Sequence, residues 1–133
     1  MIQTNNFNRV ASKVTLTEAS EGRLVGELEV KEEDSNHGGT LHGGLTAALI
    51  DILSTGALMS TGRLPGVSVD MNISYLAAGR AGETVVVDAR VLKCGRNLAF
   101  TSTDLRRKSD GTLIAQGRHT KAFPQTNTLT NTK

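Results

Sequence analysis

The 133 residues of the chain suffice for one domain with its own hydrophobic core, and they leave no room for a second domain. Lys and Arg number 15 against 13 Asp and Glu, and only 3% of the residues are aromatic. The sequence therefore lacks the dense basic stripe with interleaved aromatic side chains that is typical of nucleic-acid binding, and nucleic acid is not an expected partner.

A single cysteine, Cys94, excludes an internal disulfide and is typical of a protein from a reducing compartment. Cys94 falls in a predicted turn, and we interpret it as an ordinary exposed thiol because no base stands beside it. The first six residues match neither a signal peptide nor a transit peptide, so a cytoplasmic protein is expected. Because Asp51 interrupts the longest apolar run, no stretch reaches the roughly 18 apolar residues of a membrane span.

In the first half of the chain, two predicted strands precede a long predicted helix. Residues 13–18 and 23–30 alternate apolar and polar side chains, which indicates half-buried strands joined by a turn. A short charged loop, residues 31–34, leads to a glycine-rich turn. Apolar residues on nearly every side then predict a helix over residues 42–61, ended by Gly62.

The second half of the chain predicts four strands joined mostly by short turns. Their expected ranges are 67–75, 84–92, 98–106 and 113–121, with a turn at 93–97. Hairpins of this kind imply an antiparallel sheet, which has to cover the long apolar helix, so the fold class is α+β. The domain spans residues 1–123, and residues 124–133, rich in Thr and Asn, are expected to form a disordered tail.

The segment between residues 36 and 51 combines a glycine-rich turn with the start of the helix. Glycine allows a tight turn and close approach of a ligand to the backbone, and the first helical turn leaves N–H groups without partners. Such an end attracts an anion or a polarised carbonyl oxygen, so His42, Gly43 and Gly44 are candidate site residues. Asn36 is a turn residue whose amide could donate to an oxyanion, and both interpretations stay open.

Asp51 is the only formally charged residue between His42 and Gly62. On a mostly buried helix, a lone carboxylate either reaches solvent, bonds to a nearby hydroxyl or acts chemically. It follows Gly43 by eight positions, which separates the two by roughly 12 Å along one helix. A reacting carbonyl must lie within about 3 Å of its catalytic groups. If Asp51 and the glycine turn act on the same carbonyl, the turn must therefore belong to a second copy of the chain.

Several other kinds of site find no support in the sequence. His37, His42 and His119 do not have zinc-type spacing, so we expect solvent-facing or packed histidines and no metal. The glycines do not form a phosphate loop or a dinucleotide fingerprint, and no nucleophile elbow is present. Basic residues in loops are usually a solvated surface, although Arg80, Lys93 and Arg96 would suit a ligand that carries phosphates.

Four segments of the chain together resemble a known family. They are residues 41–44 (Leu-His-Gly-Gly) followed by the apolar helix with Asp51, then residues 65–75, 98–102 and 114–121. This combination is similar to the hotdog-fold acyl-coenzyme A thioesterases of the phenylacetate type, over about residues 7–121. The resemblance implies an antiparallel sheet wrapped around one long central helix, an acyl-coenzyme A substrate, no cofactor, and a homotetramer made of two dimers.

The resemblance also implies roles for particular residues. Asp51 corresponds to the acid that activates the hydrolytic water, with Ser68 orienting it, whereas Asn36 and the Gly43 amide, next to His42, polarise the thioester carbonyl from the opposite subunit. The residues that fall where relatives hold coenzyme A are Tyr75, Arg80, Lys93, Gly95, Arg96, Asn97 and Leu98. Those relatives begin with a longer, helical N-terminal segment, whereas only a few polar residues precede Phe7 in this sequence, and the C-terminal residues are also expected to differ from theirs.

The expected function is hydrolysis of medium- to long-chain fatty acyl-coenzyme A to free acid and coenzyme A, in the cytoplasm or the mitochondrion. Thiolate is a good leaving group, so a carboxylate base and an oxyanion site suffice for the reaction. Two alternatives remain: a hotdog dehydratase that acts on hydroxyacyl thioesters, and a non-catalytic acyl-coenzyme A-binding protein. Acyl-chain preference depends on tunnel packing, which periodicity does not reveal.

Overall fold

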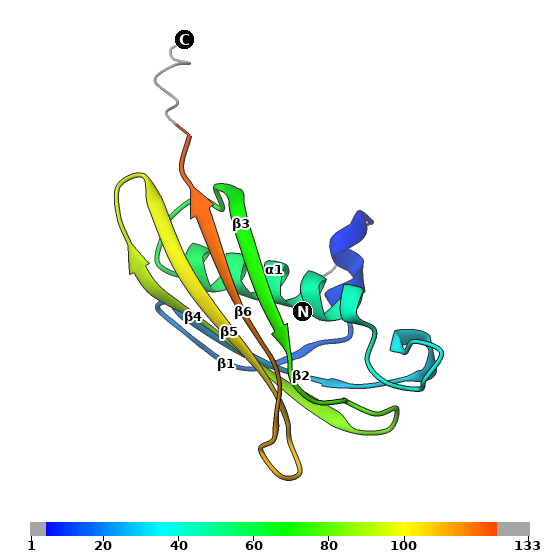
Figure 1. Ribbon diagram of the computed structural model, residues 1–133. Helices are drawn as coiled ribbons and strands as arrows, with labels where there is room; N and C mark the ends of the chain where they lie inside the picture. The colour runs from blue at the N-terminus through cyan, green and yellow to red at the C-terminus, as the bar shows by residue number, and fades with distance from the viewer. Residues whose placement is uncertain (1–4, 125–133) are drawn as a thin grey trace.

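The computed structural model describes residues 5–124 and contains one long helix against one antiparallel sheet (Figure 1). The strand order is β1-β2-β4-β5-β6-β3. The strands are β1 (Thr15–Ser20), β2 (Arg23–Glu29), β3 (Val67–Tyr75), β4 (Thr84–Cys94), β5 (Leu98–Arg107) and β6 (Leu113–Ala122). The helices are α1 (Gly43–Met59) and the short 3-10 turns η1 (Phe7–Ala11) and η2 (Glu32–Asp34). The predicted α+β architecture is confirmed, with the sheet curving around α1.

The element boundaries differ from the predicted ones in a few places. The helix ends at Met59 instead of residue 61, because Ser60 and Thr61 turn back through side-chain hydrogen bonds to the last helical carbonyls before Gly62 reverses the chain at φ 94°. Strand β4 continues through Cys94, so the turn of the β4–β5 hairpin is shorter than predicted. The predicted tail lies outside the described residues from position 125 onward.

The core lies between α1 and the concave face of the sheet. Leu49, Ile50 and Leu53 of α1 are at most 1% exposed, and they pack with inward-facing residues such as Val85 and Leu105. Burial of this kind stabilises each large aliphatic side chain by about 1.5–3 kcal/mol. The turn η1 also packs against α1, which explains why the helix is apolar on nearly every side.

Gly117 of β6 lies against the side chain of Ile50 on α1. A Cβ atom at this position would lie 2.8 Å from Ile50 Cδ1, closer than such atoms approach each other. Because Gly117 has no side chain, the Ile50 side chain can lie directly on the β6 backbone. Ile50 immediately precedes Asp51, and His119 lies two residues beyond Gly117, so this contact brings Asp51 next to His119.

Strand β3 is an edge of the sheet and pairs only with β6. Unlike an ordinary edge strand, it carries large apolar side chains that are exposed to solvent. Val67, Val69 and Tyr75 are all more than half exposed. An exposed apolar edge with unpaired backbone groups is a site for pairing with another strand.

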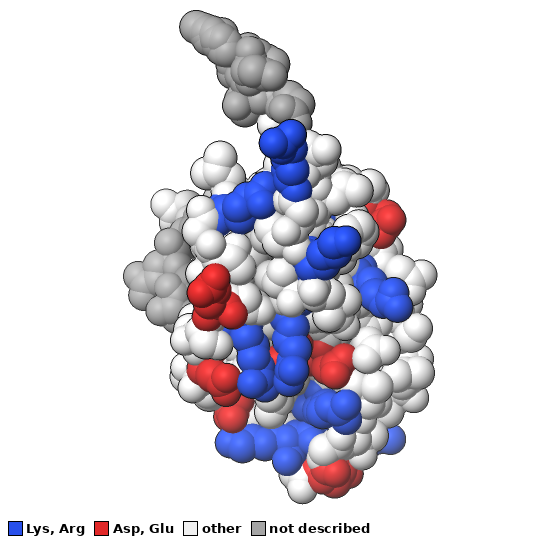
Figure 2. Space-filling view, turned by 90° about the vertical axis from the view of Figure 1, so that its left-hand side faces the viewer, with Lys and Arg blue, Asp and Glu red and all other residues white. Residues whose placement is uncertain are grey.

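Charged side chains of both signs are interspersed on the face that Figure 2 shows. The ion pairs include Arg23 on β2 with Asp88 on the neighbouring β4, Arg106 with Asp104 within β5, and Lys108, just after β5, with Glu27 on β2. Such exposed pairs contribute about 0–1 kcal/mol each. Among residues 5–124, no helix has both the length and the apolar character needed to cross a bilayer.

Candidate active site

The turn before α1 is held in place by the side chain of Asn36. Its Oδ1 accepts hydrogen bonds from the backbone N–H groups of Gly38, at 2.9 Å, and Thr40, at 3.2 Å. Its amide nitrogen donates to the Thr40 hydroxyl at 2.9 Å, which leaves the second amide proton available. The turn also needs Gly39 in the left-handed region, with φ 77°. Asn36 is thus fixed beside the start of the helix.

The start of α1 leaves one donor free. His42 caps the helix, because its Nδ1 accepts from the N–H of Gly44 at 2.8 Å. The N–H groups in the first turn of a helix have no helical carbonyl four residues earlier to accept a hydrogen bond. The N–H of Gly43 therefore has no acceptor within the helix. The hydroxyl of Tyr75 donates to the Gly43 carbonyl at 2.9 Å, and its ring lies 3.4 Å from where a Cβ on Gly43 would be. A side chain at position 43 would therefore press on Tyr75.

Asn36, Gly43 and Tyr75 line a single cavity of about 300 Å³, together with Thr46 and Ile114. We call this cavity the carbonyl half-site. It combines an amide donor, an unpaired backbone N–H and the partial positive charge of the α1 N-terminus. Donors of this kind, fixed in advance, stabilise negative charge that develops on a carbonyl oxygen.

The second group of polar residues lies further along α1 and is organised by His119. This histidine is 1% exposed, with Ser54 Oγ 2.8 Å from its Nδ1 and Ser68 Oγ 2.7 Å from its Nε2. Asp51 Oδ1 is 3.8 Å from the same Nε2, and its side chain is 47% exposed. His119 thus brings the helix residue Asp51 and the β3 residue Ser68 to the same place.

Burial lowers the pKa of His119 below its ordinary value, and the positive charge of Lys121 acts in the same direction. The negative charges of Asp51 and Asp70 oppose this shift. With the pKa below 6.5, the imidazole is neutral at pH 7. A neutral imidazole has one N–H and one lone pair, so one of its two serine partners accepts a hydrogen bond and the other donates one.

Lys121 is a further buried polar residue of this group, with only 5% of its surface exposed. It lines a cavity of about 370 Å³ with Asp51, Thr55, Met59 and Asn8. We call this cavity, with His119 and Ser68, the base half-site. Burial lowers the pKa of Lys121, while the charge of Asp51 raises it.

The carbonyl half-site and the base half-site share no lining residue within one chain. The residues expected to hold coenzyme A are divided in the same way. Tyr75 pairs with Ala115 at one end of the sheet, and Arg80 lies in the loop that follows. The β4–β5 turn lies at the opposite end, where Leu98 pairs with Ala122. One chain therefore does not bring these two loops together.

The β4–β5 turn contains Lys93, Gly95, Arg96, Asn97 and Leu98. The N–H of Gly95 donates to the Leu98 carbonyl at 2.8 Å and closes the turn. The guanidinium of Arg63 holds the turn from below, through Cys94 Sγ at 3.2 Å and the Gly95 carbonyl at 3.0 Å. Cys94 is thus half-buried at a strand end instead of an exposed turn residue. Among residues 5–124, the side chains of Arg80, Lys93 and Arg96 take part in no ion pair, which leaves their charge available to an anion.

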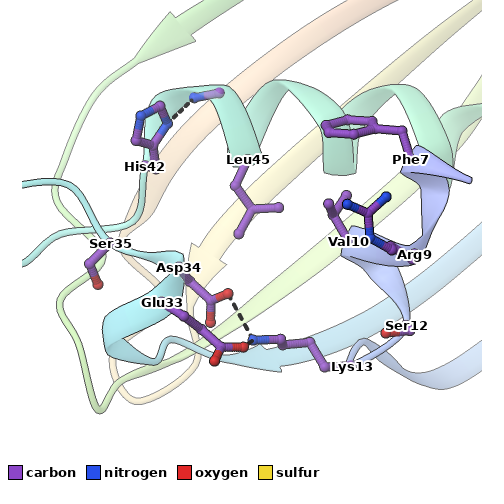
Figure 3. Close-up of a pocket in the computed structure, with 11 residues that line it drawn as sticks. Phe7, Arg9, Val10, Ser12, Lys13, Glu33, Asp34, Ser35, His42 and Leu45 are labelled. Carbon is purple, nitrogen blue, oxygen red and sulfur yellow. Dashed lines mark hydrogen bonds and ion pairs between the residues drawn. The ribbon is translucent and has the colours of Figure 1, made fainter.

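A cavity of about 680 Å³ lies between η1 and the first turns of α1 (Figure 3). Phe7, Val10 and Leu45 give it an apolar side. Its other end is polar, where Lys13 forms ion pairs with Glu33 and with Asp34, the latter at 2.9 Å. Its wall also includes His42 and Gly44, so it adjoins the carbonyl half-site at the helix start.

Sequence reasoning identified Asn36, Gly43, Asp51 and Ser68, but it did not identify His119 or Lys121 as site residues. His119 is a packed histidine, as one of the two expectations stated, but its hydrogen bonds to Ser54 and Ser68 were not expected. A signal was present: positions 117, 119 and 121 alternate with residues 116, 118 and 120, and they occupy the inward face of β6. Polar residues at the inward positions of a strand point to a functional or buried polar network.

Comparisons with known proteins place the chain among thioesterases. The family model described as "Thioesterase superfamily" matches residues 38–114. Human acyl-coenzyme A thioesterase 13 is 56% identical over 122 residues, which cover 91% of this chain and 87% of that protein. The crystal structure of zebrafish thioesterase superfamily member 2 has a TM-score of 0.89 and 52% identity, and the match covers 92% of this chain and 89% of that one. These matches confirm the resemblance that the sequence motifs indicated.

A more distant structure shares the fold alone. The hypothetical thioesterase from Streptococcus pneumoniae, solved with coenzyme A, has a TM-score of 0.82 at 22% identity, and the match covers 89% of this chain and 92% of that one.

Proposed function

Because the chain belongs to the thioesterase superfamily, we propose that it hydrolyses fatty acyl-coenzyme A to a free fatty acid and coenzyme A. The observation that carries this proposal is the base half-site, where a half-exposed carboxylate, Asp51, lies beside the buried His119, which is hydrogen-bonded to Ser68. The free N–H of Gly43 and the fixed amide of Asn36 supply the complementary oxyanion donors. The name of the human relative supports the same substrate class.

In the proposed reaction, the thioester carbonyl oxygen accepts hydrogen bonds from the Gly43 N–H and the Asn36 amide. Asp51 accepts a proton from water while the water oxygen attacks the carbonyl carbon, and Ser68 orients that water. The carbon–sulfur bond then breaks, and coenzyme A leaves as a thiolate that takes up a proton. Every group in this scheme belongs to the protein, the substrate or solvent.

Two copies complete the site by pairing their β3 strands in antiparallel fashion. This arrangement would put the Val67 end of one strand beside the Tyr75 end of the other. The base half-site and the β4–β5 turn of one subunit, both near Val67, then approach the carbonyl half-site and Arg80 of the other. The exposed apolar side chains on β3 and the separation of the half-sites support this pairing.

A charged residue on β3 tests this pairing. Val69→Lys places an ammonium group in the apolar edge, and we expect the protein mass measured by light scattering to fall to that of smaller species, with activity reduced at least tenfold. Leu16→Lys, on the opposite edge strand β1, is the matched control because Leu16 is also exposed. A Val69→Lys protein of unchanged mass contradicts the β3 interface. The mass of the native protein decides whether two dimers form the proposed tetramer.

The acyl chain extends from the carbonyl half-site into the cavity between η1 and α1. Its volume of about 680 Å³ suits a medium or long chain, and Phe7, Val10 and Leu45 provide apolar contact. The phosphates of coenzyme A are held by Arg80 of one subunit with Lys93 and Arg96 of the other, whose charges are free for this role.

Filling this cavity tests the position of the acyl chain. Val10→Trp should lower kcat/KM for palmitoyl-coenzyme A by about tenfold and leave butyryl-coenzyme A within about twofold, because only the longer chain meets the indole. Val10→Ala, which enlarges the cavity, should leave both rates near those of the native protein. An equal loss for both substrates in a Val10→Trp protein of native melting temperature would contradict this position.

Thiol release by the purified protein over a chain-length series tests the proposed function itself. Release of free thiol with each acyl group is the expected result, and its rates give the acyl preference. A 3-hydroxyacyl substrate that yields an enoyl product without thiol would instead identify a dehydratase. Saturable binding with no thiol release would identify a non-catalytic acyl-coenzyme A-binding protein.

A further inference from the structure

Lys121 is a buried cation that the proposed reaction does not use. It lies at an inward position of β6, two residues beyond His119 and opposite Ser68 on β3. Within residues 5–124 its ammonium group makes no hydrogen bond or ion pair. Placing a lysine at a buried position costs free energy of desolvation, so its presence there needs a reason other than packing. A methionine would fill the same space without that cost.

The neighbours of Lys121 suggest this reason. Asp51 lines the same cavity, and the charges of Asp51 and Lys121 act on each other. Both also act on His119: Asp51, 3.8 Å away, favours the imidazolium form, and Lys121 disfavours it. Asp70 on β3 is the remaining charged residue that acts on this histidine, and it too favours the imidazolium.

We propose that Lys121 is a positioning residue that keeps the His119 imidazole neutral, so that no imidazolium pairs with Asp51 and the carboxylate stays available to the attacking water. This inference rests on the proposed function and deepens it. Without the ammonium group, a proton on His119 would form an ion pair with Asp51 and occupy the carboxylate that has to accept a proton from water. With the ammonium group present, an added proton on His119 meets a nearby positive charge and is disfavoured.

The pH dependence of the reaction tests this role. In Lys121→Met, which keeps the length of the side chain, we expect the acidic limb of the kcat/KM profile to move up by about one pH unit. The loss should be about tenfold on that limb and less than twofold at pH 9. Lys121→Arg should restore the native profile. Lys108→Met removes an exposed lysine that pairs with Glu27, and it should leave the profile unchanged.

NMR titration of the His119 ring nitrogens gives a second measurement that does not depend on activity. In Lys121→Met the imidazole should take up its proton about one pH unit higher than in the native protein. A titration that coincides with the native one in a folded variant overturns the inference, even if activity falls. If Lys121→Met does not fold, Lys121→Gln is titrated in its place. If the native protein releases no thiol from acyl-coenzyme A, the proposed function is refuted. The titration then still decides whether Lys121 lowers the pKa of His119.

Discussion

Asp51→Asn is expected to lower kcat for acyl-coenzyme A hydrolysis by about 10² or more, the usual contribution of a general base. Asparagine keeps the shape of the side chain and its place 3.8 Å from His119, but it cannot accept the proton of the attacking water. KM should change little, because Asp51 does not hold the substrate in this scheme. Steady-state thiol release with a saturating acyl-coenzyme A measures the effect.

A second carboxylate serves as the control for this experiment. Asp104→Asn removes a charge that pairs with Arg106 on the sheet, and kcat should stay within about twofold of the native value. The melting temperatures of both variants establish that the fold is intact. Native turnover by purified Asp51→Asn would remove Asp51 from the mechanism and leave the fold assignment standing.

Mixed dimers of two inactive variants should regain activity. Asn36→Ala alone is expected to lower kcat by about 10² or more, because it removes an oxyanion donor. When Asn36→Ala and Asp51→Asn subunits are unfolded together and refolded, half of the dimers are hybrids. Each hybrid has one site with both defects and one intact site, so about a quarter of native activity should return.

The control for this experiment combines subunits with defects in the same half-site. A mixture of Asp51→Asn and Asp51→Ala subunits contains no intact site in any dimer, and it should stay inactive. If the Asn36→Ala and Asp51→Asn mixture also stays inactive while mass spectrometry of the intact dimers shows that hybrids form, both residues act within one chain. The shared site would then be wrong.

Local sequence patterns predicted most of the fold. The alternation of residues 67–75 has the same limits as β3. The predicted C-terminal end of the apolar helix lies two residues beyond the end of α1. The turns η1 and η2 were not predicted. Their few residues have no repeating pattern, and η1 is ordered by contacts with α1 that include the fully buried Ala11.

The candidate site was predictable where its residues belong to one local motif. Asn36 and Gly43 stand in the glycine turn, and Asp51 is conspicuous as the lone charge of the helix. The partners of Asp51 come from β6, almost 70 residues later. Their approach depends on strand order and on the distance between helix and sheet, which a single sequence does not specify. The alternation along β6 marks His119 as an inward polar residue, but its place beside Asp51 is recognisable only in the folded chain.

The contact between Gly117 and Ile50 sets the spacing of the base half-site. A larger residue at position 117 would lift α1 from β6 and separate Asp51 from the imidazole, and a smaller residue at position 50 would let the helix move closer. Tolerance to substitution should therefore be lowest at two buried positions that no substrate contacts. Changes in turnover among natural or engineered variants can then originate in the core, where a few tenths of an ångström at one glycine adjust the distance between Asp51 and His119.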